Sequence, residues 1–252
     1  MWPSYVINLA DNHQRMENSA RQLDVAGLPW QRLEAVNGWA MSQGAVDAVY
    51  DAARNARDGK HKLVRPEIGC YLSHIAAWRA IATGDANGGF IFEDDFAADD
   101  SLADKLARLS VSQSLWDMVK LFSFDTNPRM VFEQNLGPYR IGIPYRVPTC
   151  LIGYGITKQA AGRLIARAVP FFRPVDEDQK FIWETGLRVA LILPPPVFVG
   201  DQAAVTGTIG AVRRAARSGR SVIGQMIHNA RYQARYTRRL RQYRLNEKRW
   251  RA

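Results

Sequence analysis

The sequence has little of what membrane-spanning, secreted or disulfide-rich proteins require. It contains no apolar run long enough to cross a bilayer. Its first residues lack the basic segment and apolar stretch of a signal peptide. The two cysteines, Cys70 and Cys150, lie in neither a CxxC motif nor a zinc-ligand spacing. We therefore expect a cytoplasmic protein whose two thiols are free and buried.

Acidic residues are nearly absent from the last part of the chain. Residues 211–252 contain 13 lysines and arginines but one acid, Glu247, whereas residues 1–210 contain 21 basic and 23 acidic residues. The formal net charge of +10 is therefore a property of this tail. The pattern predicts a basic, amphipathic helix that lies on an anionic membrane, and four aromatic residues suit that interface: Tyr232, Tyr236, Tyr243 and Trp250. Solvated charge and nucleic-acid binding are the alternatives.

Apolar residues make up 47% of the chain, which is enough for a sizeable core. Strand-like runs at residues 4–9 and 30–36 enclose a helical segment, and this order is typical of a parallel sheet wrapped by helices. A helix is predicted from Pro66 to Gly84, and a buried strand at residues 88–92. We expect one α/β domain at residues 1–210 and a helical tail at residues 211–252. The proline-rich residues 125–148 predict a long loop or a hairpin.

Three acids follow the strand at residues 88–92 in the motif FIFEDD. Adjacent carboxylates repel one another, and a divalent cation relieves that repulsion. Carboxylate oxygens suit Mg²⁺ or Mn²⁺, and such an ion can also bind the diphosphate of a nucleotide-sugar. If the strand alternation continues, Glu93 and Asp95 point to one side and Asp94 to the other. We therefore predict that Glu93 and Asp95 hold the metal, with a solvated acidic loop as the alternative.

The helix that begins near Pro66 carries four candidate donor-binding residues: Glu67, Ser73, His74 and Trp78. Their spacing places His74 and Trp78 on a common face, with Ser73 beside them. The functional interpretation is that this face lines the nucleotide pocket. The structural interpretation is a buried histidine with its hydrogen bonds satisfied and a core tryptophan.

A second acidic cluster, PVDED, ends at Asp178. An inverting transferase needs a carboxylate that accepts the proton of the acceptor hydroxyl, and Asp176 is the candidate. Asp176 and Asp94 are the two predicted catalytic residues. The alternative is that Asp176 or Asp178 caps a following helix.

These motifs together resemble glycosyltransferase family 25, the lipopolysaccharide biosynthesis transferases that include β-galactosyltransferases and relatives of the collagen galactosyltransferases. The similarity runs through YVINL, RLEAVNG, EIGCYLSHIAAW, FIFEDD, CLIGYGITKQAAGRLI, PVDEDQKFIWETGL and LPPPVF. It spans most of residues 4–201. EIGCYLSHIAAW followed closely by an EDD strand end is specific, and it favours the metal role of the acids.

The resemblance implies a GT-A-like fold, a Rossmann-type mixed sheet flanked by helices, with the basic helical tail added here. It implies inversion, a UDP-hexose donor (UDP-galactose most often) and Mn²⁺ or Mg²⁺. It places Asn8 and Arg15 near the nucleotide, and the Gly153–Tyr154 strand and Asp176 on the acceptor side. The Asn37-Gly38 turn is a further expected donor contact, although family members usually have Asp or Glu at the position of Asn37.

The resulting hypothesis is an enzyme that transfers a hexose to a lipid-linked or oligosaccharide acceptor at the cytoplasmic face of the inner membrane. Three alternatives remain open. A nucleotidyltransferase would release pyrophosphate instead of UDP. A nucleic-acid-binding protein would act through the tail, but would leave the FIFEDD and SHIAAW motifs without a role. An inactive family member is the third alternative, and it is suggested by Asn37, which lacks the charge that family members usually have at this position.

Overall fold

The computed structural model describes residues 1–112, 115–200, 212 and 222–249. Within them, eight strands form one sheet in the order β2-β1-β3-β8-β5-β9-β7-β6, and two form a small ribbon, β10-β4. The strands are β1 (Ser4–Asn8), β2 (Trp30–Glu34), β3 (Gly88–Glu93), β4 (Phe96–Ala98), β5 (Met118–Lys120), β6 (Met130–Leu136), β7 (Tyr139–Pro144), β8 (Gly153–Thr157), β9 (Val189–Leu193) and β10 (Val197–Val199). β1 pairs in parallel with β2 and β3, whereas β8 is antiparallel to both its neighbours. The predicted mixed α/β sheet is confirmed, and residues 125–148 contain the β6–β7 hairpin.

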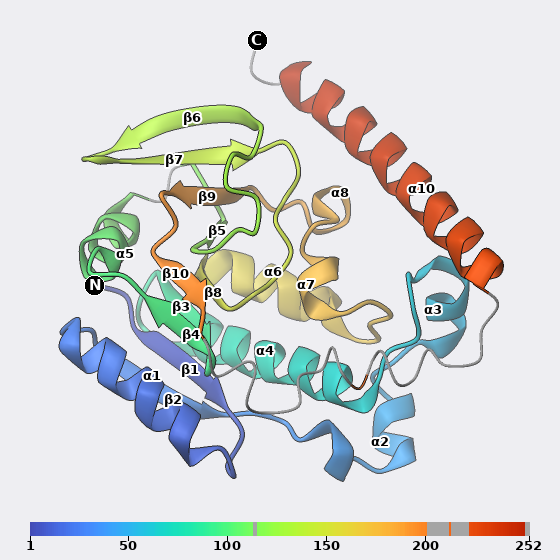
Figure 1. Ribbon diagram of the computed structural model, residues 1–252, viewed down its shortest axis with the longest axis horizontal. Helices are drawn as coiled ribbons and strands as arrows, with labels where there is room; N and C mark the ends of the chain where they lie inside the picture. Colours follow the sequence, from blue (N-terminus) through green and yellow to red (C-terminus); the bar gives the residue numbers. More distant parts are fainter. Residues whose placement is uncertain (113–114, 201–211, 213–221, 250–252) are drawn as a thin grey trace.

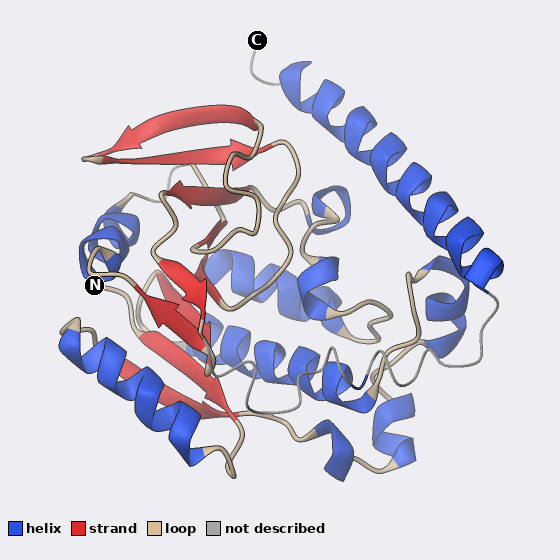
Figure 2. Ribbon diagram, viewed as in Figure 1, coloured by secondary structure: helices blue, strands red, loops and turns tan. Residues whose placement is uncertain are grey.

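Helices cover both faces of this sheet (Figure 2). They are α1 (His13–Val25), η1 (Gly38–Ala40), α2 (Gln43–Asp47), α3 (Ala52–Asp58), α4 (Arg65–Thr83), α5 (Leu102–Val111), α6 (Lys158–Ala168), α7 (Val175–Asp178), α8 (Ile182–Thr185) and α10 (Val222–Arg249). Strand alternation divides the core: Ile7 and Ile91 pack with α4 and α6, whereas Val6 and Phe90 pack on the opposite face with α1 and α5. The architecture is consistent with a GT-A-like fold.

The C-terminal helix α10 packs against the rest of the protein, on the opposite side of the molecule from α1 (Figure 1). Tyr232, Tyr236 and Leu240 belong to the same buried cluster as α4 and α6. Arg244 is also buried, and it donates to the Pro144 carbonyl at 2.6 Å. The predicted helix is therefore confirmed over Val222–Arg249 and is integral to the fold.

The expectation that the tail aromatics face a membrane is wrong for two of them. Tyr232 and Tyr236 are 3% and 5% exposed, because they pack edge-on against Phe181. Tyr243 is partly buried against the same cluster, and Trp250 lies outside the described residues. In the part of the chain that the structure describes, no helix combines the length and apolarity needed to cross a bilayer.

Substitution of one leucine of α10 is expected to destabilise the whole protein. Leu240 is fully buried, so Leu240→Ala leaves a cavity and lowers the free energy of unfolding by about 2–5 kcal/mol. Leu245 on the same helix is 64% exposed, so Leu245→Ala changes it by less than about 0.5 kcal/mol. Urea denaturation of both variants measures the difference. Equal stabilities would show that α10 does not contribute to the core.

Candidate active site

Two neighbouring parallel strands end at the same edge of the sheet, and their last residues begin the site. β1 ends at Asn8 and β3 at Glu93. The Asn8 amide donates to one carboxylate oxygen of Asp94 at 2.7 Å, and Arg15 donates to the other at 3.0 Å. Arg32 in turn donates to the Asn8 side-chain oxygen at 3.0 Å. The strand ends and α1 are thereby tied together through Asp94.

This arrangement gives a structural role to two of the predicted site residues. Asn8 is 2% exposed and Asp94 is 9% exposed, and both carboxylate oxygens of Asp94 accept hydrogen bonds. Asp94 thus anchors Arg15, and its catalytic role stays a prediction. The Asn8 side chain bonds to Asp94, Arg32 and the Asn12 carbonyl, so it positions this edge of the sheet, and its contact with a nucleotide stays a prediction.

Glu93 and Asp95 do not follow the strand alternation used to predict their directions. β3 ends at Glu93, and Asp94 and Asp95 form a turn before β4, so a two-residue period no longer applies. The two acids are nevertheless close enough to interact. Burial, followed by the charge of Glu93, raises the pKa of Asp95 to about 6, and Arg15, at 3.9 Å from it, offsets part of this effect. The turn therefore concentrates negative charge at the end of β3.

A chain of hydrogen bonds from the interior ends on Glu93. The Trp78 indole, which can only donate, donates to the Tyr154 hydroxyl oxygen at 2.8 Å. Tyr154 lies 2.9 Å from His74 Nδ1, and His74 Nε2 lies 3.2 Å from Glu93 Oε1. Because the Glu93 carboxylate accepts, we assign the His74 proton to Nε2, and Tyr154 then donates to Nδ1. Glu93 is thus oriented by a buried histidine.

The predicted direct contact of His74 and Trp78 with a nucleotide does not agree with this structure. Both residues have no exposed surface, since they pack between α4 and the sheet. The structural alternative is correct for Trp78, and His74 reaches the site through Glu93.

Removal of the central hydroxyl of this chain is expected to destabilise the protein. Tyr154→Phe leaves the Trp78 indole and His74 Nδ1 without their buried partner, which costs about 1–3 kcal/mol of unfolding free energy. Tyr145→Phe is the control, because Tyr145 is partly exposed. Thermal denaturation compares the two. A Tyr154→Phe variant as stable as the control would contradict the hydrogen-bond assignment.

The remaining predicted donor-site residues connect α4 to the loop before η1. Ser73 Oγ accepts from the Val36 amide at 2.8 Å and donates to the Gly69 carbonyl at 2.8 Å. A Cβ at Gly38 would lie 1.9 Å from the Arg65 carbonyl oxygen, so the loop can lie this close only with glycine there. Asn37 accepts from the Trp39 amide at 3.0 Å and caps η1. These residues fix the loop beside the end of β2.

Glu67 starts α4 and is not placed to bind a donor. It is 3% exposed, and its carboxylate accepts from the Val64 amide at 2.8 Å and lies 3.1 Å from His61 Nε2. Glu67 therefore caps α4 and contacts His61, and it does not have the predicted role of a donor contact. Trp39, which the sequence analysis did not single out, is the exposed aromatic side chain of this loop, at 60%.

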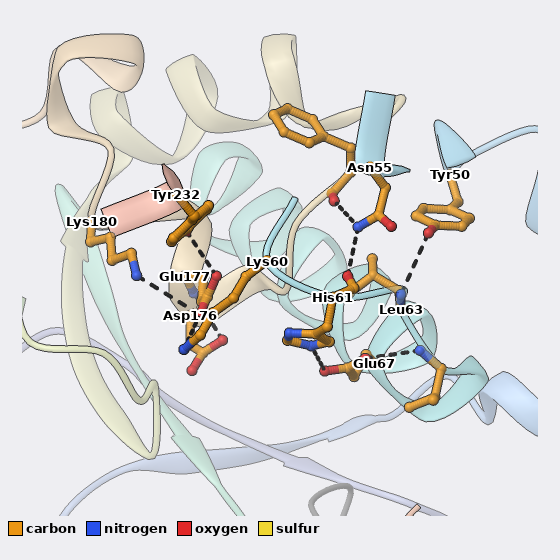
Figure 3. Close-up of polar contacts among 12 residues, drawn as sticks. Tyr50, Asn55, Lys60, His61, Leu63, Glu67, Asp176, Glu177, Lys180 and Tyr232 are labelled. Atoms are coloured by element: carbon orange, nitrogen blue, oxygen red, sulfur yellow. Dashed lines mark hydrogen bonds and ion pairs between the residues drawn. The ribbon is translucent and has the colours of Figure 1, made fainter. Parts of the chain in front are cut away.

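The structure brings Asp176 near the acids of β3, although the two segments are far apart in the sequence. Asp176 accepts from the Glu177 amide at 2.8 Å (Figure 3). It does not cap a helix, because Pro174 precedes α7 and Phe181 precedes α8. Burial is the main cause of its raised pKa, Glu177 and Glu93 raise it further, and Lys120 lowers it. Asp178 instead accepts from the Tyr71 hydroxyl at 2.8 Å and pairs with Arg173. A carboxylate with a raised pKa thus lies within electrostatic reach of the acids at the end of β3.

Comparison of the sequence with known protein families identifies the family of this chain. Residues 1–178 match the model of glycosyltransferase family 25, described as LPS biosynthesis protein. The chain belongs to glycosyltransferase family 25. The matched residues contain the acids of β3, the whole of α4 and Asp176, and end at the last residue of α7.

Curated glycosyltransferases and an inactive relative also show similarity to this chain. Human inactive glycosyltransferase 25 family member 3 is 26% identical over 185 residues, which cover 69% of this chain and 30% of that protein. Human procollagen galactosyltransferase 2 is 26% identical, covering 69% of this chain and 29% of that protein. A putative glycosyltransferase of Haemophilus influenzae is 26% identical over 52% of this chain and 44% of its own length. The chain therefore spans less than half the length of these relatives.

Lys120 is a site residue of this family 25 chain that the sequence analysis missed. It has no exposed surface, and its Nζ donates to the Cys150 carbonyl at 2.7 Å. Burial lowers the pKa of Lys120 to about 8, and the carboxylates of Asp176 and Glu93 oppose that shift. A single lysine within the apolar run MVKLF was the available signal. The residue supplies a buried cation near two acids from distant parts of the chain.

Cys70, His74 and Glu93 could form a second ligand set at the same edge. Their ligand atoms lie within 4.8 Å of one another. However, His74 Nε2 carries a proton in the tautomer assigned above, and burial with the nearby acids raises the pKa of the Cys70 thiol well above its usual value. Binding of an ion there would require the Cys70 thiol to ionise and the His74 proton to move from Nε2 to Nδ1, beside the Tyr154 hydroxyl. Glu93 and Asp95 therefore remain the predicted metal ligands.

Proposed function

We propose that this chain is an inverting, metal-dependent glycosyltransferase that moves a hexose from a UDP-sugar to a surface-glycan acceptor. The observation that carries the proposal is the placement of two partly buried acids, Glu93 and Asp95, at the end of β3, with Asp176 within electrostatic reach of Glu93. Open α/β sheets bind their ligands at such strand ends. Membership of family 25 supports the transferase class.

The residues at the end of β3 fit a divalent cation. Glu93 and Asp95 offer hard carboxylate oxygens, which suit Mn²⁺ or Mg²⁺. The pKa of Asp95, raised to about 6 by burial and by Glu93, indicates that the ionised pair is unfavourable without a counter-charge. A bound cation would supply that charge and stabilise the diphosphate leaving group.

The chain's own residues have separate roles in the proposed transfer. His74 orients the carboxylate of Glu93 through Nε2. Asp176 accepts the proton of the acceptor hydroxyl, and its raised pKa makes it a stronger base for that task. Lys120, held at the Cys150 carbonyl, places one positive charge near Asp176 and Glu93 and limits their mutual repulsion.

Galactose is the proposed hexose and a lipopolysaccharide the proposed acceptor. The first follows from the procollagen galactosyltransferases among the relatives, and the second from the family description. Contact with an anionic membrane would use the outer face of α10, where four arginines are exposed: Arg231, Arg238, Arg239 and Arg241. Arg235 is also exposed but pairs with Asp58 of α3. We propose a cytoplasmic enzyme at the inner membrane face.

An inactive family member is the second candidate. It is favoured by the similarity to human inactive glycosyltransferase 25 family member 3 and by Asn37, which caps η1 without contributing a charge. The two candidates differ in turnover and not in fold.

UDP release from purified protein, measured over a panel of UDP-sugars with Mn²⁺ or with EDTA, tests the proposal. Metal-dependent release from UDP-galactose is the expected result. Pyrophosphate release from a nucleotide would indicate a nucleotidyltransferase. Folded protein that neither binds nor turns over a UDP-sugar would support the inactive relative.

A further inference from the structure

A cavity of about 550 Å³ lies away from the acids of β3, between α3, the segment that follows it and the first turns of α10. Two lysines, Lys60 and Lys62, and two histidines, His61 and His228, contribute to its lining. The ten described residues that line it include no acid. Its volume is that of a small-molecule site, and its charge favours an anion.

The wall of this cavity is held by buried hydrogen bonds. The Asn55 side chain donates to the carbonyls of His61 at 2.9 Å and Phe172 at 2.7 Å. His61 is 7% exposed, and its Nε2 lies 3.1 Å from Glu67 (Figure 3). His61 Nδ1 is buried and has no hydrogen-bond partner among the described residues. Because this nitrogen has almost no accessible surface, His61 belongs to the fixed wall of the cavity and its Nδ1 does not face the cavity space.

The cavity is connected to the proposed catalytic base. Lys60 lines it, and the Lys60 ammonium lies 3.5 Å from Glu177 Oε1. Tyr232 of α10 donates to the other oxygen of Glu177 at 3.0 Å, and the Glu177 amide donates to Asp176 (Figure 3). The cavity is thus adjacent to the Asp176 side of the site, where the acceptor is expected.

One wall of the cavity comes from beyond the family match. The match ends at residue 178, whereas Gly224 and His228 belong to α10. His228 Nε2 donates to the Gly59 carbonyl at 2.7 Å and joins α10 to the opposite wall. The α10 wall of the cavity therefore lies outside the family match, whereas the wall formed by α3 and the segment after it lies inside it.

We propose that this cavity binds a phosphorylated sugar of the acceptor, an inference that rests on the proposed transferase function. The lysine ammonium groups supply charge-assisted hydrogen bonds to the phosphate. Lys60 and Nδ1 of His228, whose ring is held through Nε2, supply partners for sugar hydroxyls. Binding there holds the acceptor beside Asp176 without contact with the acids of β3.

Calorimetry on the full chain tests the proposal with glucose 6-phosphate as the probe, and with glucose and inorganic phosphate as comparisons. We expect glucose 6-phosphate to bind more tightly than either. Lys62 is exposed, so substitution there leaves the core intact; Lys62→Ala is expected to weaken binding about tenfold, and Lys62→Glu to abolish it. Arg140→Ala, which removes an exposed charge from the β6–β7 hairpin, is the control and keeps wild-type affinity.

Two results would overturn the proposal. One is glucose 6-phosphate binding no tighter than inorganic phosphate or glucose. The other is Lys62→Glu binding like the wild type. UDP release is measured on wild-type protein without glucose 6-phosphate, so a failure of the transferase function is seen separately from a failure of this site.

Discussion

Asp95→Asn is expected to reduce metal-dependent UDP release by at least about 10²–10³-fold. The variant keeps the shape of the side chain but removes one of the two charges that hold the cation, and with it stabilisation of the leaving group. Asp100→Asn is the control, since Asp100 is exposed five residues further on. UDP release from UDP-galactose over a range of Mn²⁺ concentrations measures both variants. Wild-type turnover in Asp95→Asn would show that Asp95 is not a ligand of the metal.

The same variant is expected to be at least as stable as the wild type in EDTA. Burial raises the pKa of Asp95 from 3.8 to about 6, so the folded state is favoured when Asp95 is protonated. The stabilisation of the folded state by protonated Asp95 is fully present below about pH 4 and is lost as the pH rises through about 6. The asparagine side chain of the variant cannot ionise, so the stability of the variant does not decrease for this reason as the pH rises. Thermal denaturation at pH 4.5 and 7.5 should therefore show a smaller decrease for Asp95→Asn than for the wild type.

Asp176→Asn is expected to lower turnover by about 10²–10⁴-fold while leaving the affinity for UDP and Mn²⁺ unchanged within about threefold. The asparagine oxygen can still accept from the Glu177 amide, but the side chain cannot take a proton from the acceptor. Steady-state UDP release gives the turnover, and calorimetry gives the affinity. Wild-type turnover would exclude Asp176 as the base.

Asp178→Asn, two residues away, provides a contrast. Asp178 accepts from Tyr71 and pairs with Arg173, which is 2% exposed, so this substitution is expected to lower stability and to leave the turnover of the folded fraction near wild type. Because the pKa of Asp176 is raised, wild-type turnover should also fall as the pH is lowered and Asp176 becomes protonated. The Asp176→Asn variant should lack the part of this decrease that is due to Asp176 and keep the part that is due to protonation of Asp95 near pH 6.

The elements that position the site could be predicted because their signals are local. The short apolar runs of β1 and β3 and the helical spacing of α4 are properties of short segments, and all three form as expected. The acids were expected at the end of a buried strand, and β3 ends at Glu93. Their directions were not predictable, because Asp94 and Asp95 enter a turn whose geometry depends on Asn8 and Arg15.

The sequence by itself determined the family, the α/β order of elements, the acids that follow β3 and the basic C-terminal helix, since each is written in consecutive residues or in a local period. Only the tertiary structure decided which groups meet. Asp94 accepts hydrogen bonds that hold Asn8, and Trp78 and His74 are buried hydrogen-bond partners of Tyr154. Two tyrosines of α10 lie in the core. Lys120 came to lie within reach of the charges of Glu93 and Asp176. These outcomes depend on contacts between segments that are far apart in the chain, so no local pattern encodes them. Forming such contacts costs chain entropy, and the burial of apolar surface offsets that cost.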